Sequence, residues 1–127
     1  MVRPTDPRYA AQWHFGLLGN IERVWDEYTG AGVTVGVFDN GIQYTHPDLN
    51  DNYNPALHFT HEGIVYDPMP ITLTGPYQDA HGTSVAGIIA GEAKNGIGGA
   101  GVAWTARITG VNLLSDPRLG TDDMIPV

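Results

Sequence analysis

The stretch VTVGVFDNG, residues Val33–Gly41, decides the fold. Its first six residues form a short apolar run rich in valine, which is typical of a strand buried on both faces of a parallel sheet. The turn-forming residues Asp39, Asn40 and Gly41 end that run. We therefore predict a strand over residues 33–38, with Asp39 at its carboxyl end, where functional groups gather in open α/β sheets.

The second informative stretch is DAHGTSVAGIIAG, residues Asp79–Gly91. We predict a helix from Ser84 to about Glu92, with Val85, Ile88 and Ile89 on its packing side. Its small residues Ala86, Gly87 and Ala90 would permit close approach to a neighbouring element. The other expected elements are a short amphipathic helix over residues 21–28, a long loop over 50–79, a Gly-rich turn over 94–101, a strand over 106–114 and a helix capped by Thr121 or Asp122. This order indicates an α/β fold, and two core strands indicate the opening portion of a larger domain.

Composition excludes several classes of protein. The chain has 127 residues and a net charge of −8, with only six Lys and Arg, so a nucleic-acid binder is not expected. Acidity fits a soluble, extracellular protein and, weakly, bound cations or basic peptide substrates. Cysteine is absent and no window is apolar enough for a membrane span. MVRPTDPRYAAQ is not a signal peptide. Three explanations therefore stay open: the protein stays inside the cell, it is exported without an N-terminal signal, or the chain is incomplete.

Asp39 and His81 form a candidate catalytic pair. The predicted fold puts Asp39 at the end of a strand and His81 near the start of the next helix. A carboxylate that accepts from one imidazole nitrogen would hold the tautomer and leave the other nitrogen free to act as a base. The plainer interpretation is a turn-forming Asp and a polar His at a helix start.

Two motifs resemble the signatures of subtilisin-like serine proteases (subtilases). The aspartate motif is Val35-Gly-Val-Phe-Asp39-Asn-Gly-Ile, followed by His46-Pro-Asp48-Leu, and the histidine motif is His81-Gly-Thr-Ser-Val-Ala-Gly87. The N-terminal Asp6-Pro and Gln12-Trp-His resemble the kexin (proprotein convertase) branch. The similarity runs from about Asp6 to Ser115. It implies a three-layer α/β fold with a central parallel sheet, an extracellular serine endopeptidase, Asp39 as orienting group and His81 as general base.

The nucleophilic serine of such a triad is missing from the expected place. In the family it lies far downstream in a Gly-Thr-Ser-x-Ala motif, and this chain has only Ser84 and Ser115. Ser84 lies inside the histidine motif, three residues after the base, so we do not expect it to be the nucleophile. The chain thus carries two triad members of three, needs the missing C-terminal part of the catalytic domain, and should be inactive alone.

The resemblance also implies a structural calcium site. Calcium binds six to eight oxygen atoms from carboxylates, amides and carbonyls. Carried over from the kexin branch, the ligands are the side chains of Asp6, Asp48 and Asn95 with the carbonyls of Glu92, Ile97 and Gly99. The register of the first carbonyl, Glu92 or Ala93, stays open, and so does a plain helix-ending turn with two solvated aspartates.

Asn40 and Asp79 are the candidate substrate-binding residues for a protein or peptide substrate. Kexin-like proteases cleave after paired basic residues with the help of acidic groups, yet Asn40 stands where that branch has a second aspartate, and only Asp79 remains of an acidic pair before His81. Strict dibasic specificity is therefore in doubt, and broad cleavage or a single basic residue is equally open. Residues 115–120 are a candidate edge for pairing with substrate backbone.

Other interpretations are weaker. Gly96-Ile-Gly-Gly-Ala-Gly101 matches the dinucleotide-binding fingerprint but follows a helix, whereas the fingerprint should follow a strand and open a helix. His58, His61 and Glu62 do not make a zinc-binding helix motif. The serious alternative is a non-catalytic, calcium-binding interaction module that retains a protease shell.

Overall fold

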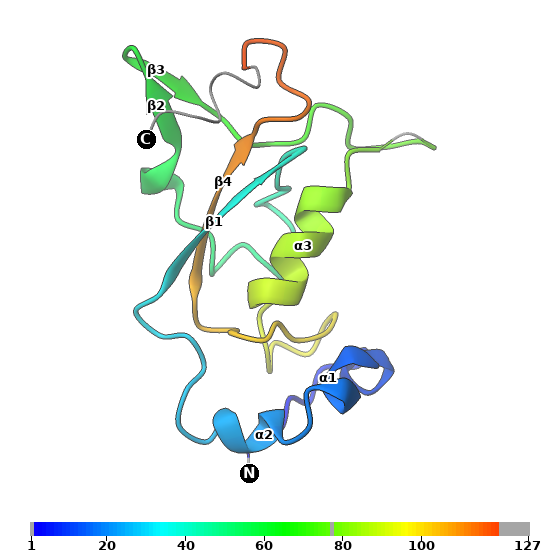
Figure 1. The fold of residues 1–127 in the computed structure, drawn as a ribbon. Helices are drawn as coiled ribbons and strands as arrows, with labels where there is room; N and C mark the ends of the chain where they lie inside the picture. Colours follow the sequence, from blue (N-terminus) through cyan, green and yellow to red (C-terminus); the bar gives the residue numbers. More distant parts are fainter. Residues whose placement is uncertain (1, 77, 120–127) are drawn as a thin grey trace.

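The computed structural model describes residues 2–76 and 78–119. Its elements, in chain order, are the 3-10 helix η1 (Tyr9–Ala11), α1 (His14–Leu17), α2 (Ile21–Val24), β1 (Thr34–Asp39), the 3-10 helix η2 (Pro55–Leu57), β2 (Phe59–His61), β3 (Ile64–Tyr66), α3 (His81–Ala90) and β4 (Arg107–Asn112). Figure 1 shows α3 alongside the β1–β4 pair, with the short N-terminal helices at one end and the β2–β3 hairpin at the other.

Strands β1 and β4 pair in parallel, with Val35 opposite Ile108 and Asp39 opposite Asn112. Parallel neighbours need a long crossover, and α3 lies within it. On its other side, Ile108 hydrogen-bonds to the segment around Tyr53, so β4 lies between β1 and that segment. The carboxyl ends of both strands therefore meet at one edge, close to the start of α3 (Figure 1).

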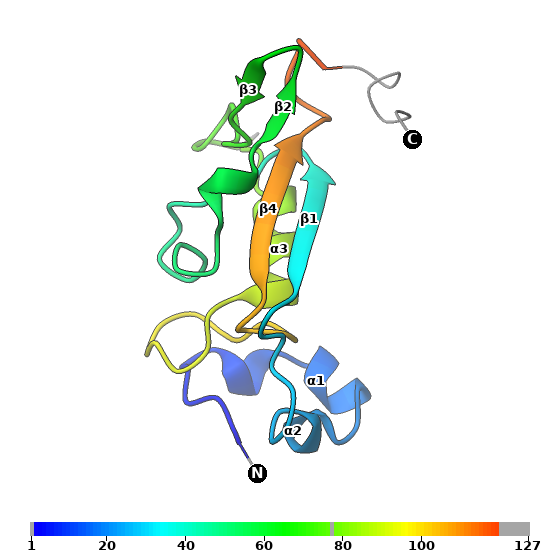
Figure 2. The ribbon, with the colours of Figure 1, turned by 90° about the vertical axis from the view of Figure 1, so that its left-hand side faces the viewer.

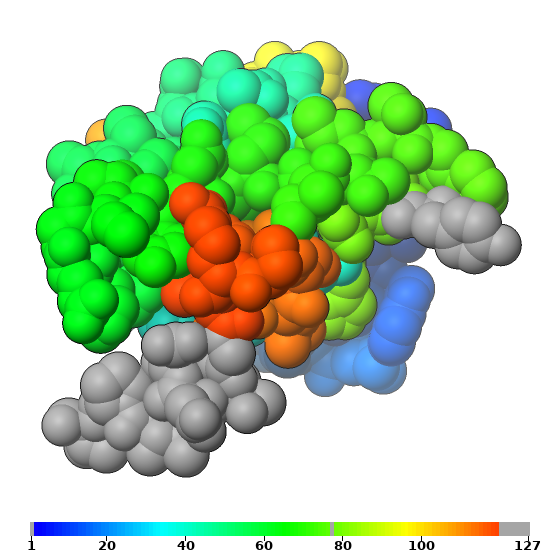
Figure 3. Space-filling view, turned by 90° about the horizontal axis from the view of Figure 1, so that it is seen from above, coloured from blue at the N-terminus to red at the C-terminus, as the bar shows by residue number. Residues whose placement is uncertain are grey.

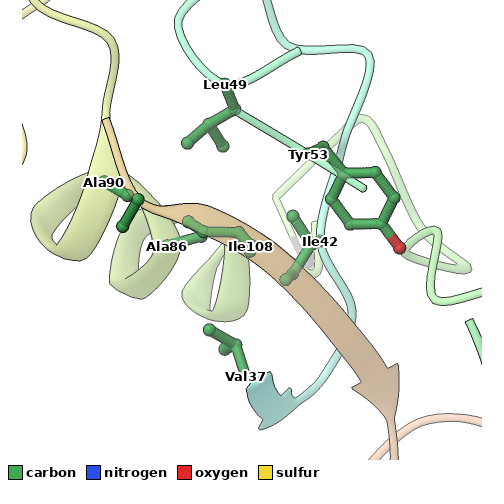
Figure 4. Close-up of a cluster of buried hydrophobic side chains, with 8 residues drawn as sticks. Val37, Ile42, Leu49, Tyr53, Ala86, Ala90 and Ile108 are labelled. Atoms are coloured by element: carbon green, nitrogen blue, oxygen red, sulfur yellow. The ribbon is translucent and has the colours of Figure 1, made fainter. Parts of the chain in front are cut away.

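Small residues on α3 let the helix pack closely on the sheet. The main core contains eight buried residues: Val37, Ile42, Leu49, Tyr53, Ala86, Ala90, Ala106 and Ile108. Figure 4 shows Ala86 and Ala90 of the helix directed toward Ile108 of β4. A second cluster consists of Tyr9, Phe15, Trp25, Ala100 and Trp104. It packs the N-terminal arm, residues 2–20, against the segment before β4.

The predicted two strands are confirmed with shifted ends, but burial of β1 on both faces is wrong for the described residues. Val37 is 5 % exposed and faces α3, whereas Phe38 on the opposite face is 63 % exposed. Figure 2 shows this opposite face of the β1–β4 pair toward the viewer, with α3 behind it. Residues 2–76 and 78–119 thus form two layers of the expected three.

The helix predicted from Ser84 begins three residues earlier, at His81, and ends at Ala90. Its buried residues are Gly82, Ala86 and Ala90 rather than the larger side chains that we expected. Ile88 is 51 % exposed, and Val85 and Ile89 are partly buried at the margin of the core. The close approach expected at Ala86 and Ala90 is confirmed, whereas a Cβ at Gly87 would meet no described atom within 4 Å. The packing side was wrong because close packing on the sheet favours the smallest residues, not the most apolar ones.

The amphipathic helix predicted over residues 21–28 is only one turn, α2. Trp25 is 2 % exposed because it joins the second cluster, where its indole N–H donates to the Val102 carbonyl at 2.8 Å. Val24 and Tyr28 are exposed, so the apolar residues of this segment do not share one buried face.

The long loop predicted over residues 50–79 contains η2 and a hairpin. Strands β2 and β3 pair antiparallel through a two-residue turn at Glu62 and Gly63, whose φ angles are 48° and 78°. Two positive φ values are the mark of a type I′ turn, which matches the twist of a hairpin. Each strand has only three residues, too few for an alternating pattern to stand out in the sequence.

The segment after β4 forms turns over residues 115–119, not the extended substrate edge that we predicted. Asp116 is 7 % exposed and its carboxylate accepts from Nε of Arg118 at 2.9 Å. The Arg118 guanidinium lies 4.8 Å from the centre of the Tyr66 ring, which joins this segment to the hairpin. Figure 3 shows the orange segment beside the green hairpin. Residue 120 and the predicted helix cap at 121 or 122 lie outside the described residues.

No helix in the described part of the chain is both long and apolar enough to span a bilayer.

Candidate active site

Asp39 is held by its backbone and its carboxylate at the end of β1. Its carbonyl accepts from the backbone N–H groups of Leu113 and Leu114 at 2.9 and 3.2 Å. Its carboxylate accepts from the Asn40 backbone N–H at 2.7 Å, and the residue is 9 % exposed. Asp39 is thus a buried carboxylate with a fixed direction.

His81, the first residue of α3, meets that carboxylate directly. Its Nδ1 lies 2.9 Å from Oδ1 and 2.8 Å from Oδ2 of Asp39. Since a carboxylate accepts, Nδ1 carries the proton and Nε2 is the basic nitrogen. The His81 side chain is 73 % exposed, and Nε2 has no protein partner among the described residues. The structure therefore brings together both predicted catalytic residues, with the ring nitrogen that would act as base facing solvent.

The glycine after His81 lets this pair form. A Cβ at Gly82 would lie 2.9 Å from the Asp39 Cβ and closer still to the Gly41 carbonyl oxygen. One residue further on, the Thr83 hydroxyl oxygen accepts from the Gln43 N–H at 2.9 Å. In this His-Gly-Thr sequence, His81 provides the imidazole, Gly82 allows α3 to approach β1 closely, and Thr83 accepts a hydrogen bond from the turn after β1.

The two predicted substrate-binding residues both have partners inside the chain. The Asn40 side-chain oxygen accepts from the Gly82 N–H at 2.9 Å. The Asp79 carboxylate accepts from the Thr72 N–H at 3.1 Å, while the Asp79 N–H donates to the Thr72 carbonyl at 2.8 Å. Asp79 also lines a cavity of about 210 Å³, together with Gln43, His46, Thr72, Leu73, Gln78, Ala80, Thr83 and Ser84. This cavity lies beside the start of α3.

Ser84 is not placed to be activated by His81. Its hydroxyl donates to the Ala80 carbonyl at 2.9 Å, in the manner of a Ser that bonds back along its own helix. In residues 2–76 and 78–119 no serine hydroxyl contacts the His81 ring.

At the other end of α3, the residues of the predicted calcium site meet in one turn. Asp6 is 5 % exposed, and its carboxylate accepts from the backbone N–H groups of Lys94, Asn95 and Gly96 at 2.7, 3.1 and 3.3 Å. The Asp48 carboxylate accepts from the Asn95 side-chain N–H at 2.9 Å. Two carboxylates from distant parts of the sequence therefore both contact Asn95.

The carbonyl residues of the predicted site belong to the same turn. Asp48 also accepts from the Gly99 N–H at 3.2 Å, and Ile97 donates its N–H to the Asn95 side-chain oxygen at 3.1 Å. Glu92 donates its N–H to the Asp48 carbonyl at 2.9 Å. All six predicted ligand residues thus lie around one turn, although the interactions just described involve their N–H groups and side chains rather than their carbonyls.

The donor set of this turn fits a hard cation. Asp6 and Asp48 have no ion-pair partner among the described residues. The Lys94 ammonium lies 5.8 Å from the centre of the Trp104 ring, where it forms a cation–π contact. Carboxylate, amide and carbonyl oxygens are the ligands that Ca²⁺ prefers. Within residues 2–76 and 78–119 no group of three His, Cys, Asp or Glu side chains could hold a metal, so a cation at this turn would also need amide and carbonyl oxygens.

Sequence reasoning missed a residue that supports this turn. Gln12 donates its side-chain N–H to the Ala100 carbonyl and accepts from the Ala100 N–H, both at 2.8 Å. A Cβ at Gly99 would lie 2.5 Å from the Gln12 side-chain oxygen, so the turn and the N-terminal arm are in close contact. The Gln12-Trp-His motif was the feature of the sequence that could have indicated this role. It does not indicate which backbone groups the Gln12 amide binds.

The fold places a buried carboxylate against an exposed imidazole at one edge of an α/β sheet, and comparison with known families gives the class of the protein. Residues 30–126 match the subtilase family (peptidase S8), and the chain belongs to that family. This confirms the family predicted from the two motifs.

Proprotein convertases such as furin and neuroendocrine convertase 2 are among the curated relatives of the chain, which confirms the predicted branch. The chain is 40 % identical over 116 residues to furin from Homo sapiens, which covers 87 % of this chain and 14 % of furin. It is 35 % identical over 128 residues to neuroendocrine convertase 2 from Sus scrofa, covering 91 % of this chain and 20 % of that protein. The chain thus spans only a small part of the length of these relatives.

Solved structures confirm the subtilisin-like α/β fold. A protease from Pseudoalteromonas arctica aligns with a TM-score of 0.70 and 31 % identity, over 88 % of this chain and 39 % of the other. A serine protease of Aeromonas sobria aligns with a TM-score of 0.57 and 44 % identity, over 70 % of this chain and 14 % of the other.

Proposed function

We propose that this chain supplies the general base and its orienting carboxylate to a serine endopeptidase. One observation carries the proposal: Nδ1 of His81 lies 2.8 Å from the Asp39 carboxylate while the ring is 73 % exposed. An imidazole held by one nitrogen and open at the other is suited to take a proton from a hydroxyl. Membership of the subtilase family supports a role in proteolysis.

The proposed chemistry needs a serine from a part of the protein outside this chain. Nε2 of His81 takes the serine proton as the oxygen attacks the scissile carbonyl. Asp39 stabilises the imidazolium that results, and His81 then returns the proton to the leaving amine. The chain alone lacks the nucleophile and should be inactive, because loss of a triad serine costs a factor on the order of a million in a related enzyme.

Calcium at the turn after α3 would serve the fold rather than the chemistry. Asp6, Asp48 and Asn95 would bind it with side-chain oxygens, and Glu92, Ile97 and Gly99 with carbonyl oxygens. A bound cation would offset the repulsion between two carboxylates that both contact Asn95. It would thereby join the N-terminal arm to the main core.

A protein or peptide is the proposed substrate, and the extracellular space is the proposed location. Asn40 adds no charge beside the base, and Asp79 is bonded to Thr72. A site with these features favours broad or single-basic cleavage over strict dibasic cleavage.

Cleavage kinetics of the complete protein test this function. His81→Ala should abolish peptide hydrolysis, whereas His61→Ala, which removes an exposed imidazole from the hairpin, should leave it unchanged. Equal activity of wild type and His81→Ala would refute the role of the base. A complete wild-type protein that cleaves no peptide but is stabilised by Ca²⁺ would favour the non-catalytic interaction module.

A further inference from the structure

Asn40 contacts Asp39 and Gly82, the residue that directly follows His81. Its backbone N–H donates to the Asp39 carboxylate at 2.7 Å, and its side-chain oxygen accepts from the Gly82 N–H at 2.9 Å. We propose that Asn40 is a positioning residue that fixes the first turn of α3, and with it the His81 ring, against Asp39. The effect of Asn40 on catalysis rests on the proposed function, whereas its effect on the position of His81 does not.

The start of α3 needs such a partner. Ala80 stands at the N-cap and provides no side-chain hydrogen bond, so the first N–H groups of the helix lack a cap of their own. The Asn40 amide oxygen satisfies the Gly82 N–H from another element. Gly82 directly follows His81. The hydrogen bond from its N–H to Asn40 therefore restrains the peptide bond between His81 and Gly82.

Asn40 can act as an anchor because its own backbone is fixed. It forms an isolated bridge with Asn112, next to the end of β4. Gly41 has a φ of 106°, and a Cβ there would lie 2.8 Å from the Pro68 carbonyl oxygen. The Ile42 N–H donates to that same carbonyl at 2.8 Å. The backbone that carries the Asn40 side chain is therefore fixed close to Gly82.

This geometry separates positioning from substrate binding. The Asn40 oxygen already accepts from the Gly82 N–H, and the neutral amide has no negative charge to pair with a basic substrate side chain. The same amide holds the helix without placing a second negative charge beside Asp39. Removal of the side chain should therefore disturb the His81–Asp39 hydrogen bond and reduce turnover, with little effect on substrate affinity.

The direct test is nitrogen-15 NMR of the His81 ring in the complete protein, with the signal assigned by its loss in His81→Gln. Wild type should show the Nδ1–H tautomer with a downfield Nδ1 proton. Asn40→Ala should lose that proton signal and mix the tautomers, while Asn40→Asp, which keeps an acceptor for Gly82, should retain the Nδ1–H form. Rescue by aspartate guards against general unfolding of the alanine variant.

A second asparagine provides the matched control. The Asn54 side chain accepts from the Ala56 N–H at 3.1 Å and caps η2, away from His81. Asn54→Ala should leave the His81 signals as in wild type. An unchanged Nδ1 proton in Asn40→Ala, or an equal change in Asn54→Ala, would overturn the positioning role.

Kinetics of the complete protein then separate this role from the proposed function. Asn40→Ala should lower kcat by about 10- to 100-fold, as expected for a misplaced catalytic group, and leave KM for a basic peptide unchanged. A rise in KM with constant kcat would instead assign Asn40 to substrate binding. If the complete wild type cleaves nothing but the NMR response holds, the positioning role stands and the peptidase function fails.

Discussion

The two ends of α3 present carboxylates in opposite situations. At the first residue, the Asp39 carboxylate meets Nδ1 of His81, and Nε2 of that ring, which has no protein partner among the described residues, faces solvent. Beyond the last residue, Asp6 and Asp48 meet backbone and amide N–H groups but, within the part of the chain that the structure describes, no basic side chain. At the His81 end, the Asp39 carboxylate already has a basic partner. At the other end, two carboxylates lie close together, and a bound cation would balance their negative charge.

This difference separates chemistry from stability. Changes at the His81 end should affect turnover and leave unfolding nearly unchanged, because the ring is mostly exposed. Changes at the Asp6 end should affect unfolding and its dependence on Ca²⁺, because Asp6 is buried and ties the N-terminal arm to the core. The predictions below probe this division, from the largest expected effect to the smallest.

The largest effect is expected from Asp39→Asn in the complete protein. An amide donor at this position would favour the wrong tautomer of His81, and the same change in a related triad lowers kcat by about 10⁴-fold. We expect a similar loss in peptide cleavage, with a melting temperature close to wild type. A loss of less than tenfold would mean that the carboxylate does not orient the base.

Removal of calcium should destabilise the chain. A ligand at 100 times its Kd adds about 2.7 kcal/mol to the free energy of unfolding, so chelation should clearly lower the melting temperature. Thermal unfolding with and without Ca²⁺ checks this. Asp6→Asn should abolish the Ca²⁺ response, whereas Glu27→Gln, which removes one exposed charge from the segment after α2, should preserve it. Equal melting curves with and without Ca²⁺ would argue against the site.

Two glycines of α3 should respond in opposite directions to alanine. A Cβ at Gly82 would press on Asp39 and on the Gly41 carbonyl, and overpacking of this kind costs about 1–3 kcal/mol. A Cβ at Gly87 would meet no described atom within 4 Å, so Gly87→Ala should gain up to about 1 kcal/mol from helix propensity. Urea unfolding of both variants measures the contrast. A Gly82→Ala chain as stable as wild type would mean that β1 and α3 are less closely packed.

The smallest effect concerns Asp116. Its hydrogen bond from the Arg118 side chain lowers the pKa of the Asp116 carboxyl below its usual value. A lowered pKa stabilises the fold above about pH 4 and loses this contribution as the pH falls through the folded-state pKa. Asp116→Asn should therefore be less stable than wild type at pH 7, and the difference should shrink in acid. Urea unfolding of both proteins at pH 7 and below pH 4 checks this trend. The same difference in the free energy of unfolding at both pH values would contradict it.

The parts of the fold that depend on local chemistry could be predicted from the sequence. The valine-rich run before Asp39 predicted β1, and the small-residue run after His81 predicted α3 to within three residues at its start. The pairing of Asp39 with His81 followed because the carboxyl end of a strand and the start of the next helix meet at one edge of a parallel sheet.

What could not be predicted depends on contacts between distant segments. The amphipathic pattern at residues 21–28 failed because Trp25 packs with Trp104 and bonds to Val102. The hairpin was missed because its strands are too short to show a period. The partner of Asn40 could not be read from the sequence either, since an amide after a strand is equally suited to a turn, a substrate or a helix N–H.

Labelling of the complete protein by a serine-directed phosphonate tests the central claim most directly, because the reagent reacts only with an activated hydroxyl. Wild type should be labelled at one serine outside residues 1–127, and His81→Ala should lose that labelling. Labelling of His81→Ala at the wild-type rate would show that this imidazole does not activate the nucleophile, and the account of the Asp39–His81 pair would be wrong.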